Sequence, residues 1–186
     1  MIRAFIAIEI AAPAIASISA AIEQLKPRID GIRWIAPSNI HLTVKFLGDI
    51  DESKVNAVGE ALTSALRPFP PCTINAKGLG VFPSIKRPRV LWVGLVGSEL
   101  TTLAAQVELT LAPLGFSREE RGFTPHLTVG RWRQGAKAEP TLAAALDRWK
   151  DFDFGPSAID EVIVFQSVLK PQGAIYTRIK VVPLAI

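Results

Sequence analysis

The spacing of apolar residues changes along the chain, and each change marks a new structural element. Residues 2–10 form an apolar, β-branched run that is typical of a buried strand. After Pro13 the apolar residues recur at steps of three and four, which predicts an amphipathic helix that ends before Pro27. A second strand is expected at residues 40–47, after a turn rich in Gly and Pro. The chain therefore begins with a strand, a helix and another strand.

The same patterns continue to the end of the chain. A second helix is expected after Asp51, which can cap it, and a third begins with Ser98 as its cap. A fourth helix is marked by apolar residues within 142–149. The remaining strands are expected at 73–82, 89–96, 125–132, 159–168 and 174–182. A basic, Pro-rich loop at 83–88 separates the first two of these strands, and a turn at 171–173 joins the last two.

The two halves of the chain share one order of elements: a helix, a strand with a histidine, another helix, and two closely connected strands. This shared order indicates an internal duplication. Short connections favour antiparallel neighbours, so we expect an α+β fold with two pseudo-symmetric lobes. Each lobe should contain an antiparallel-rich sheet with helices outside, and the sheets should face each other across a central cleft. Because no flexible linker separates the halves, residues 1–186 are expected to form a single bilobal domain.

Composition limits the classes of protein that remain. At 186 residues and 49% hydrophobic content, the chain can bury a sizeable core, and its net charge of +4 permits a polyanionic partner. The single cysteine, Cys72, excludes a disulfide within one chain and fits a reducing compartment. The apolar amino terminus is similar to a secretory signal, but Glu9 and Pro13 interrupt it. We therefore expect a cytoplasmic protein with no membrane segment. A monomer is also expected, although nothing in the sequence determines the oligomeric state.

A repeated tetrapeptide carries the candidate chemistry. The chain has two histidines, His41 and His126, and each begins the sequence His-Leu-Thr-Val. A chance match of the three following residues is expected well under about one time in a thousand. Residues two apart on a strand face the same side, so His41 and Thr43 should project together, as should His126 and Thr128. Either the pairs meet in one cleft, or each is a hydrogen-bonded structural feature of its strand; the duplication favours the cleft.

Two imidazoles and two hydroxyls suit the hydrolysis of a phosphodiester. A neutral imidazole can take a proton from the attacking water while a protonated one gives a proton to the departing ribose oxygen. Unperturbed imidazoles have a pKa near about 6.5, so both forms are accessible near neutral pH. The hydroxyls can donate to the non-bridging oxygens of the transition state. The residues alone do not say which histidine takes which role.

Other reaction classes lack their residues. A hydrolytic zinc would need a third ligand, and nothing in the sequence suggests which carboxylate would supply it. The chain has no Gly-x-Ser-x-Gly elbow, and its glycine-rich run at 78–83 lacks the last glycine of a dinucleotide fingerprint and a P-loop lysine. We therefore expect no metal and no cofactor.

Longer segments around both motifs carry a resemblance to a known family. They are residues 3–8, 34–43, 46–48, 80–83, 88–92, 123–128, 131, 166–167 and 173–176. Over nearly the whole chain the sequence resembles the RNA 2′,3′-cyclic phosphodiesterases, also called 2′-5′ RNA ligases, of the two-histidine phosphoesterase superfamily. The resemblance implies metal-independent hydrolysis of RNA 2′,3′-cyclic phosphate ends to 2′-phosphomonoesters, and it allows the reverse ligation. It also implies that His41 is the proton donor, His126 is the proton acceptor, and Arg131 contacts the phosphate together with Thr43 and Thr128.

Alternatives stay open at this point. The same fold could bind nucleotides or RNA without turnover, or could act on small cyclic nucleotides. Several aromatic residues could stack on a base, although core packing is favoured for each: Phe5, Trp34, Phe82 and Tyr176. Lys86, Arg87 and Arg89 could steer RNA towards the cleft or could form a solvated loop. Cys72 is interpreted as a packing residue.

Overall fold

The structure is a computed structural model, and it describes residues 1–136, 140–171 and 173–185. Its strands are β1 (Ile2–Glu9), β2 (Ile32–Trp34), β3 (His41–Ile50), β4 (Cys72–Ser84), β5 (Arg87–Val96), β6 (His126–Trp132), β7 (Asp153–Ile159), β8 (Glu161–Lys170) and β9 (Gly173–Pro183). Its helices are α1 (Ala12–Leu25), α2 (Lys54–Leu66), α3 (Ser98–Leu111) and α4 (Leu142–Asp147). Three short 3-10 turns are η1 (Lys26–Arg28), η2 (Pro37–Asn39) and η3 (Ala112–Leu114).

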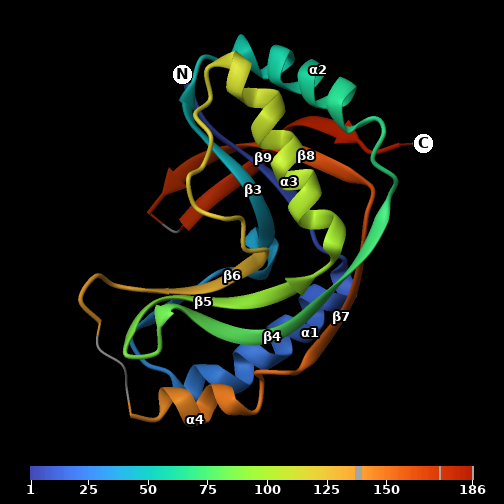
Figure 1. Ribbon diagram of the computed structural model, residues 1–186. Helices are drawn as coiled ribbons and strands as arrows, with labels where there is room; N and C mark the ends of the chain where they lie inside the picture. Colours follow the sequence, from blue (N-terminus) through green and yellow to red (C-terminus); the bar gives the residue numbers. More distant parts are fainter. Residues whose placement is uncertain (137–139, 172, 186) are drawn as a thin grey trace.

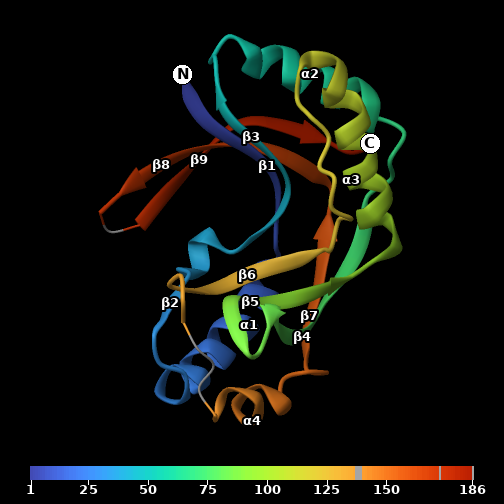
Figure 2. The ribbon, with the colours of Figure 1, turned by 60° about the vertical axis from the view of Figure 1, so that its left-hand side comes forward.

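The strands form one antiparallel sheet in the order β7-β4-β5-β6-β3-β1-β8-β9, with β2 beside β6. The two central strands, β3 and β6, are paired at Leu42 and Leu127 alone. The sheet therefore divides there into two lobes that curl towards each other (Figures 1 and 2). The upper lobe in Figure 1 contains β3, β1, β8 and β9, and α2 and α3 lie outside it. The lower lobe contains β6, β5, β4 and β7, with β2 beside β6, and α1 and α4 lie outside it. The predicted α+β fold with two lobes is confirmed.

Each lobe combines elements from both halves of the chain. The strand pair β4–β5 of the first half joins β6, the histidine strand of the second half. The strand pair β8–β9 of the second half lies on the side of β3, the histidine strand of the first half, through β1. Helix α2 packs against β9, and α1 packs against β7. The two halves of the chain are thus interleaved, and neither lobe is made by one half alone.

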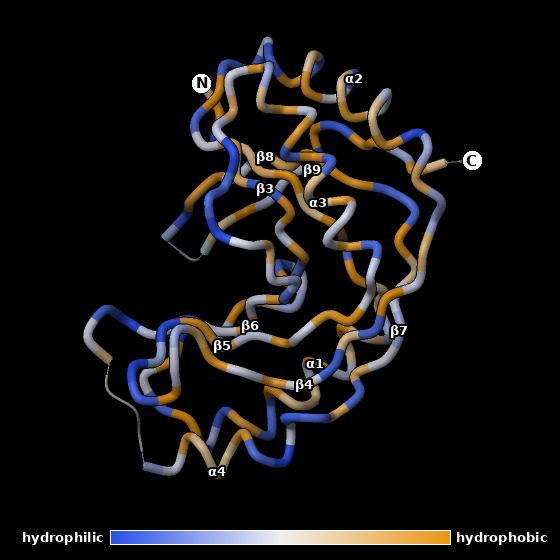
Figure 3. Tube along the Cα trace, in the orientation of Figure 1, coloured by the Kyte–Doolittle hydropathy of each residue, from blue (hydrophilic) through white to orange (hydrophobic). Residues whose placement is uncertain are grey.

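The main core lies between the sheet and the outer helices. The inner faces of α2 and α3 are closed to solvent at Leu62, Leu66, Val107 and Leu111. Figure 3 shows hydrophobic positions recurring along the helices and strands, while the connecting loops are mostly hydrophilic. A smaller cluster of Phe5, Ala7, Ile163 and Phe165 lies on the other face of the upper lobe. This second cluster supports the face of the sheet that carries His41.

Two strands and one hairpin differ from the sequence-based predictions. β2 and β7 were not predicted: β2 has three residues, and β7 contains Gly155 and Pro156, which weaken a strand pattern. The expected loop at 83–88 is mostly strand, because β4 and β5 remain paired as far as Ser84 and Arg87. Gln172, within the expected last turn, lies outside the described residues.

Both predicted helix caps were wrong by one or two residues. Ser53 occupies the N-cap position of α2, and the Asp51 carboxylate accepts a hydrogen bond from the Ser53 backbone N–H at 2.9 Å. Asp51 therefore shapes the turn that precedes the helix. Gly97 is the N-cap of α3, and Ser98 is its first helical residue.

Candidate active site

The two histidine strands expose the same positions. The order of buried and accessible residues from His41 to Leu47 is identical to that from His126 to Trp132. In both strands the histidine and the threonine are partly accessible, whereas the leucine between them is buried. The structure brings both His-x-Thr pairs and Arg131 to one cavity of about 270 Å³, here called the catalytic pocket.

A β-bulge in β6 explains how Arg131 reaches this pocket. Strict alternation would place residue 131 on the face opposite to His126. The pairing with β5 shifts between Thr128 and Gly130, so Val129 is an extra residue in the strand. The bulge reverses the alternation, and Arg131 lines the pocket on the same side as His126 and Thr128.

The other histidine strand has a bulge at the same place. β3 shifts against β1 between Thr43 and Lys45, so Val44 is the extra residue. Lys45 is turned into the protein interior, and Phe46 faces the pocket with 70% of its surface exposed. Phe46 is therefore the pseudo-symmetric counterpart of Arg131. The sequence pattern does not mark Phe46 as a site residue, because an apolar side chain at this position is typical of a core until the bulge is known.

His41 is held among aromatic rings. Its imidazole stacks on Phe5 with 4.9 Å between ring centroids, and the Tyr176 ring is nearly perpendicular to it with 5.2 Å between centroids. Its Nε2 lies 3.1 Å from the Thr43 hydroxyl oxygen. Burial lowers the pKa of His41 to about 4; a hydrogen bond with the Asn39 backbone opposes this effect, and the positive charge of Arg131 adds to it. His41 is therefore neutral at pH 7 when the pocket holds no anion.

His126 is oriented by the backbone two residues before it. Its Nδ1 lies 2.7 Å from the Thr124 carbonyl oxygen. Because a carbonyl oxygen can only accept, Nδ1 carries the proton and donates it, which leaves Nε2 available for chemistry. The Phe82 ring is perpendicular to the imidazole, with 5.2 Å between ring centroids. Asn39, which also lies two residues before its histidine, holds the corresponding place beside His41.

The four aromatic candidates separate into two groups. Phe5 and Tyr176 line the catalytic pocket, although Phe5 is only 4% exposed and serves mainly to pack against His41. Trp34 packs against the main core, and Phe82 packs against the Trp92 ring and His126. Neither of these two lines the pocket.

The basic candidates and the cysteine lie apart from the pocket. Lys86, Arg87 and Arg89 are exposed at the tip of the β4–β5 hairpin and do not line it. Cys72 packs against the main core, and burial raises the pKa of its thiol, with the negative charge of Glu99 adding to the effect. These contacts fit a packing role for Cys72.

The described residues contain neither a cluster of metal-ligating side chains nor a membrane-spanning helix. In residues 1–136, 140–171 and 173–185, no group of three or more His, Cys, Asp and Glu side chains is placed to hold a metal ion. None of the helices within these ranges is both long and apolar enough to cross a bilayer.

Comparison with known proteins identifies the family. The model of a family described as LigT-like phosphoesterase matches the chain twice, at residues 8–92 and 93–176. The chain belongs to this family. The double match also confirms the internal duplication, since each copy contains one histidine motif.

Two relatives are similar to this chain over almost their full length. An RNA 2′,3′-cyclic phosphodiesterase of Thermotoga maritima is 36% identical, with 94% of this chain and 91% of the relative covered. One from Methanothermobacter thermautotrophicus is 32% identical, with 97% of both covered. Among solved structures, Escherichia coli LigT in complex with 3′-AMP is 25% identical with a TM-score of 0.78, covering 100% of this chain and 99% of that one. A Thermus thermophilus protein, 24% identical over 98% of this chain and 97% of its own, shares the fold with a TM-score of 0.82.

Proposed function

We propose that this protein is an RNA 2′,3′-cyclic phosphodiesterase that opens cyclic phosphate ends to 2′-phosphomonoesters. The observation that carries the proposal is the convergence of two His-x-Thr pairs and one arginine on a single pocket. The names of relatives that are aligned over nearly the whole chain support the same activity. The proposal treats residues 1–186 as one bilobal domain, active as a monomer in the cytoplasm.

The proposed reaction is an in-line displacement at phosphorus. Water attacks the phosphorus, the bond to the ribose 3′ oxygen breaks, and the 2′-phosphate remains. His126 takes the proton from water through Nε2, and His41 gives a proton to the departing 3′ oxygen. Thr43, Thr128 and Arg131 contact the non-bridging oxygens, where negative charge increases. If an RNA 5′ hydroxyl attacks the phosphorus in place of water, the bond to the 3′ oxygen breaks in the same way and a 2′-5′ linkage forms; water competes with that ligation.

The low pKa of His41 bears on the assignment of roles. A donor must be protonated, whereas His41 has a pKa of about 4 without a bound anion. An anionic phosphodiester beside the ring raises this pKa, because its negative charge stabilises the protonated imidazole and offsets the effects of burial and of the Arg131 charge. The exchanged assignment, in which neutral His41 takes the proton from water, is favoured by the same low pKa. The pH dependence of the rate does not distinguish the two assignments, because each of them requires one protonated and one neutral imidazole.

Replacing the leaving oxygen separates the two assignments. A substrate with sulfur at the 3′ position releases a thiolate, which needs no proton donor, so loss of the acid is tolerated and loss of the base is not. With the oxygen substrate, His41→Ala and His126→Ala should each lower kcat/KM at least about a hundredfold. With the sulfur substrate, His41→Ala should lose less than about tenfold. If His126→Ala is the tolerated variant, the roles are exchanged.

One product analysis tests the activity itself. The wild-type protein is incubated with an RNA that ends in a 2′,3′-cyclic phosphate, in the presence of a chelator. Formation of the 2′-monoester is expected, and the 3′-monoester would contradict the proposed direction of opening. Binding without ring opening would indicate a module without turnover. Loss of activity in the chelator would indicate that a metal ion takes part.

A further inference from the structure

The catalytic pocket continues into a larger cavity. This larger arm measures about 870 Å³, against about 270 Å³ for the pocket. Both share Thr43, Phe46, His126, Thr128 and Arg131, so the arm begins at the residues that are proposed to hold the phosphate. Its other walls are α3 and the segment 117–124, which leads into β6. A group bound in the pocket can therefore extend into this larger arm.

A buried ion pair fixes the outer wall of the larger arm. Lys45 Nζ lies 2.6 Å from the Glu108 carboxylate of α3 and 2.8 Å from the Ser117 carbonyl oxygen. Glu108 also accepts a hydrogen bond from the Glu119 backbone N–H at 3.3 Å. The Lys45 and Glu108 side chains are only 5% and 15% exposed. These contacts join β3, α3 and the segment 117–124. They hold that segment beside the cleft, so a ligand is not needed to position it.

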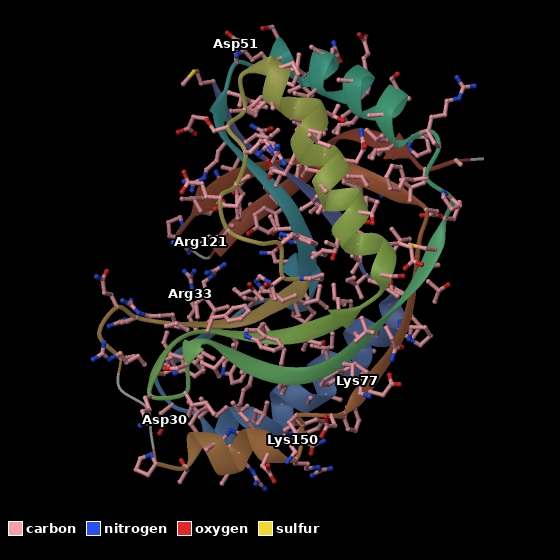
Figure 4. All side chains as sticks on the ribbon, in the orientation of Figure 1. Asp30, Arg33, Asp51, Lys77, Arg121 and Lys150 are labelled. Carbon is pink, nitrogen blue, oxygen red and sulfur yellow. The ribbon has the colours of Figure 1, made fainter. Side chains whose placement is uncertain are left out.

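Arginines lie in the larger arm and beside it. Arg118 and Arg121 line it from the segment 117–124. Arg33 of β2 lines neither cavity, but it is the direct cross-strand neighbour of Arg131, which lines both, so the two side chains project from the same face. Figure 4 shows Arg33 and Arg121 on the same side of the molecule, one from each lobe. The five ion pairs among the described residues include none of these arginines.

We propose that the larger arm holds the RNA chain that precedes the terminal nucleotide, with Arg33 and Arg121 contacting its phosphates. This inference rests on the proposed function. Glu119 and Glu120 also line the arm, so a uniform positive field does not explain binding there. Individual guanidinium groups can still make directed, forked contacts to a phosphate. The exposed Phe46 ring at the junction of pocket and arm offers a face for a base to stack on.

The test compares two substrates that end in the same nucleotide. One is a nucleoside 2′,3′-cyclic phosphate, and the other is a tetranucleotide with that cyclic end. The wild-type protein should have a kcat/KM at least about tenfold higher for the tetranucleotide. Arg121→Ala and Arg33→Ala should each lower that value about tenfold, mainly through KM, which corresponds to one lost charged contact. For the nucleoside substrate, both variants should stay within about twofold of wild type.

Salt and a matched variant provide the controls. Arg28→Ala removes the same charge from an exposed position in η1 that lines neither cavity and, unlike Arg33, is not paired with β6; it should leave both substrates unaffected. The dependence of KM on salt should fall by about one ion for Arg121→Ala with the tetranucleotide. Arg121→Gln repeats the test if the alanine variant has a lowered melting temperature.

The outcomes separate the two proposals. Three results would each overturn the proposed RNA path. The arginine variants could lose equal kcat/KM on both substrates, they could lose none on the tetranucleotide, or the wild-type protein could show no preference for the longer substrate. Opening of the nucleoside substrate in those cases would leave the proposed function intact. A wild-type protein that opens neither substrate would refute the proposed function and the path with it.

Discussion

The buried His41 should make the stability of the fold depend on pH. Burial lowers its pKa from 6.5 to about 4 in the folded protein, whereas the solvated ring of the unfolded chain keeps its ordinary value. Between these two values the unfolded chain binds a proton that the folded protein does not. The free energy of unfolding therefore falls as the pH drops from about 6.5 towards about 4, and it changes little from this cause above pH 6.5.

The size of the effect follows from the two pKa values. Each pH unit between them corresponds to about 1.4 kcal/mol, so the loss reaches about 2 kcal/mol at pH 5 and about 3 kcal/mol at pH 4, relative to pH 7. A domain is typically stable by only about 5–15 kcal/mol, so this loss is easily measured.

Urea denaturation at several pH values, for wild type and His41→Gln, isolates this contribution. Carboxylates titrate in both proteins, so their effects cancel in the difference between the two pH profiles. Between pH 7 and pH 5 the wild-type protein should lose about 2 kcal/mol more than the variant. Parallel profiles would show that burial does not lower the pKa of His41, and they would contradict a neutral ring in the free protein.

Three further predictions concern packing and phosphate contact. Lys45→Met should lower the free energy of unfolding, measured by urea denaturation, by about 3 kcal/mol, because the Glu108 carboxylate is left buried without its partner. Adding Glu108→Met should restore most of this loss, and a double variant that stays as unstable as Lys45→Met would contradict the reasoning. In Gly80→Ala the new methyl group would overlap the Trp92 indole ring, so the free energy of unfolding should fall by about 2 kcal/mol. In Gly122→Ala the methyl group meets no atom within 4 Å, so this control should have the melting temperature of the wild type. Arg131→Lys should lower kcat/KM about tenfold because an ammonium cannot make the forked contact; unchanged turnover would argue against that contact.

The elements with a strong apolar period could be predicted from the sequence. The four apolar positions that define α2 are Val55, Val58, Leu62 and Leu66, and all of them are buried. β2 could not be predicted, because three residues are too few to show a period. β7 could not be predicted either, because it acquires its conformation by pairing with β4, a contact between residues distant in the chain.

The candidate site shows the same division between local pattern and tertiary pairing. The strand period places His41 beside Thr43, and the duplication suggests that His126 joins them. The period also places Arg131 on the wrong face and does not mark Phe46 at all. Both positions depend on a single extra residue in each strand, and a bulge becomes visible only when the partner strand is known.

The interleaved lobes have a consequence for the origin of this architecture. A chain of half this length would carry one imidazole and would leave its strand edges unpaired. Two such chains that exchanged strand pairs would complete the same sheet, with the reaction centre on their two-fold axis and one imidazole from each copy. In the single chain the two copies need not be identical, and one pocket position differs between them: the second copy has Arg131 where the first has Phe46.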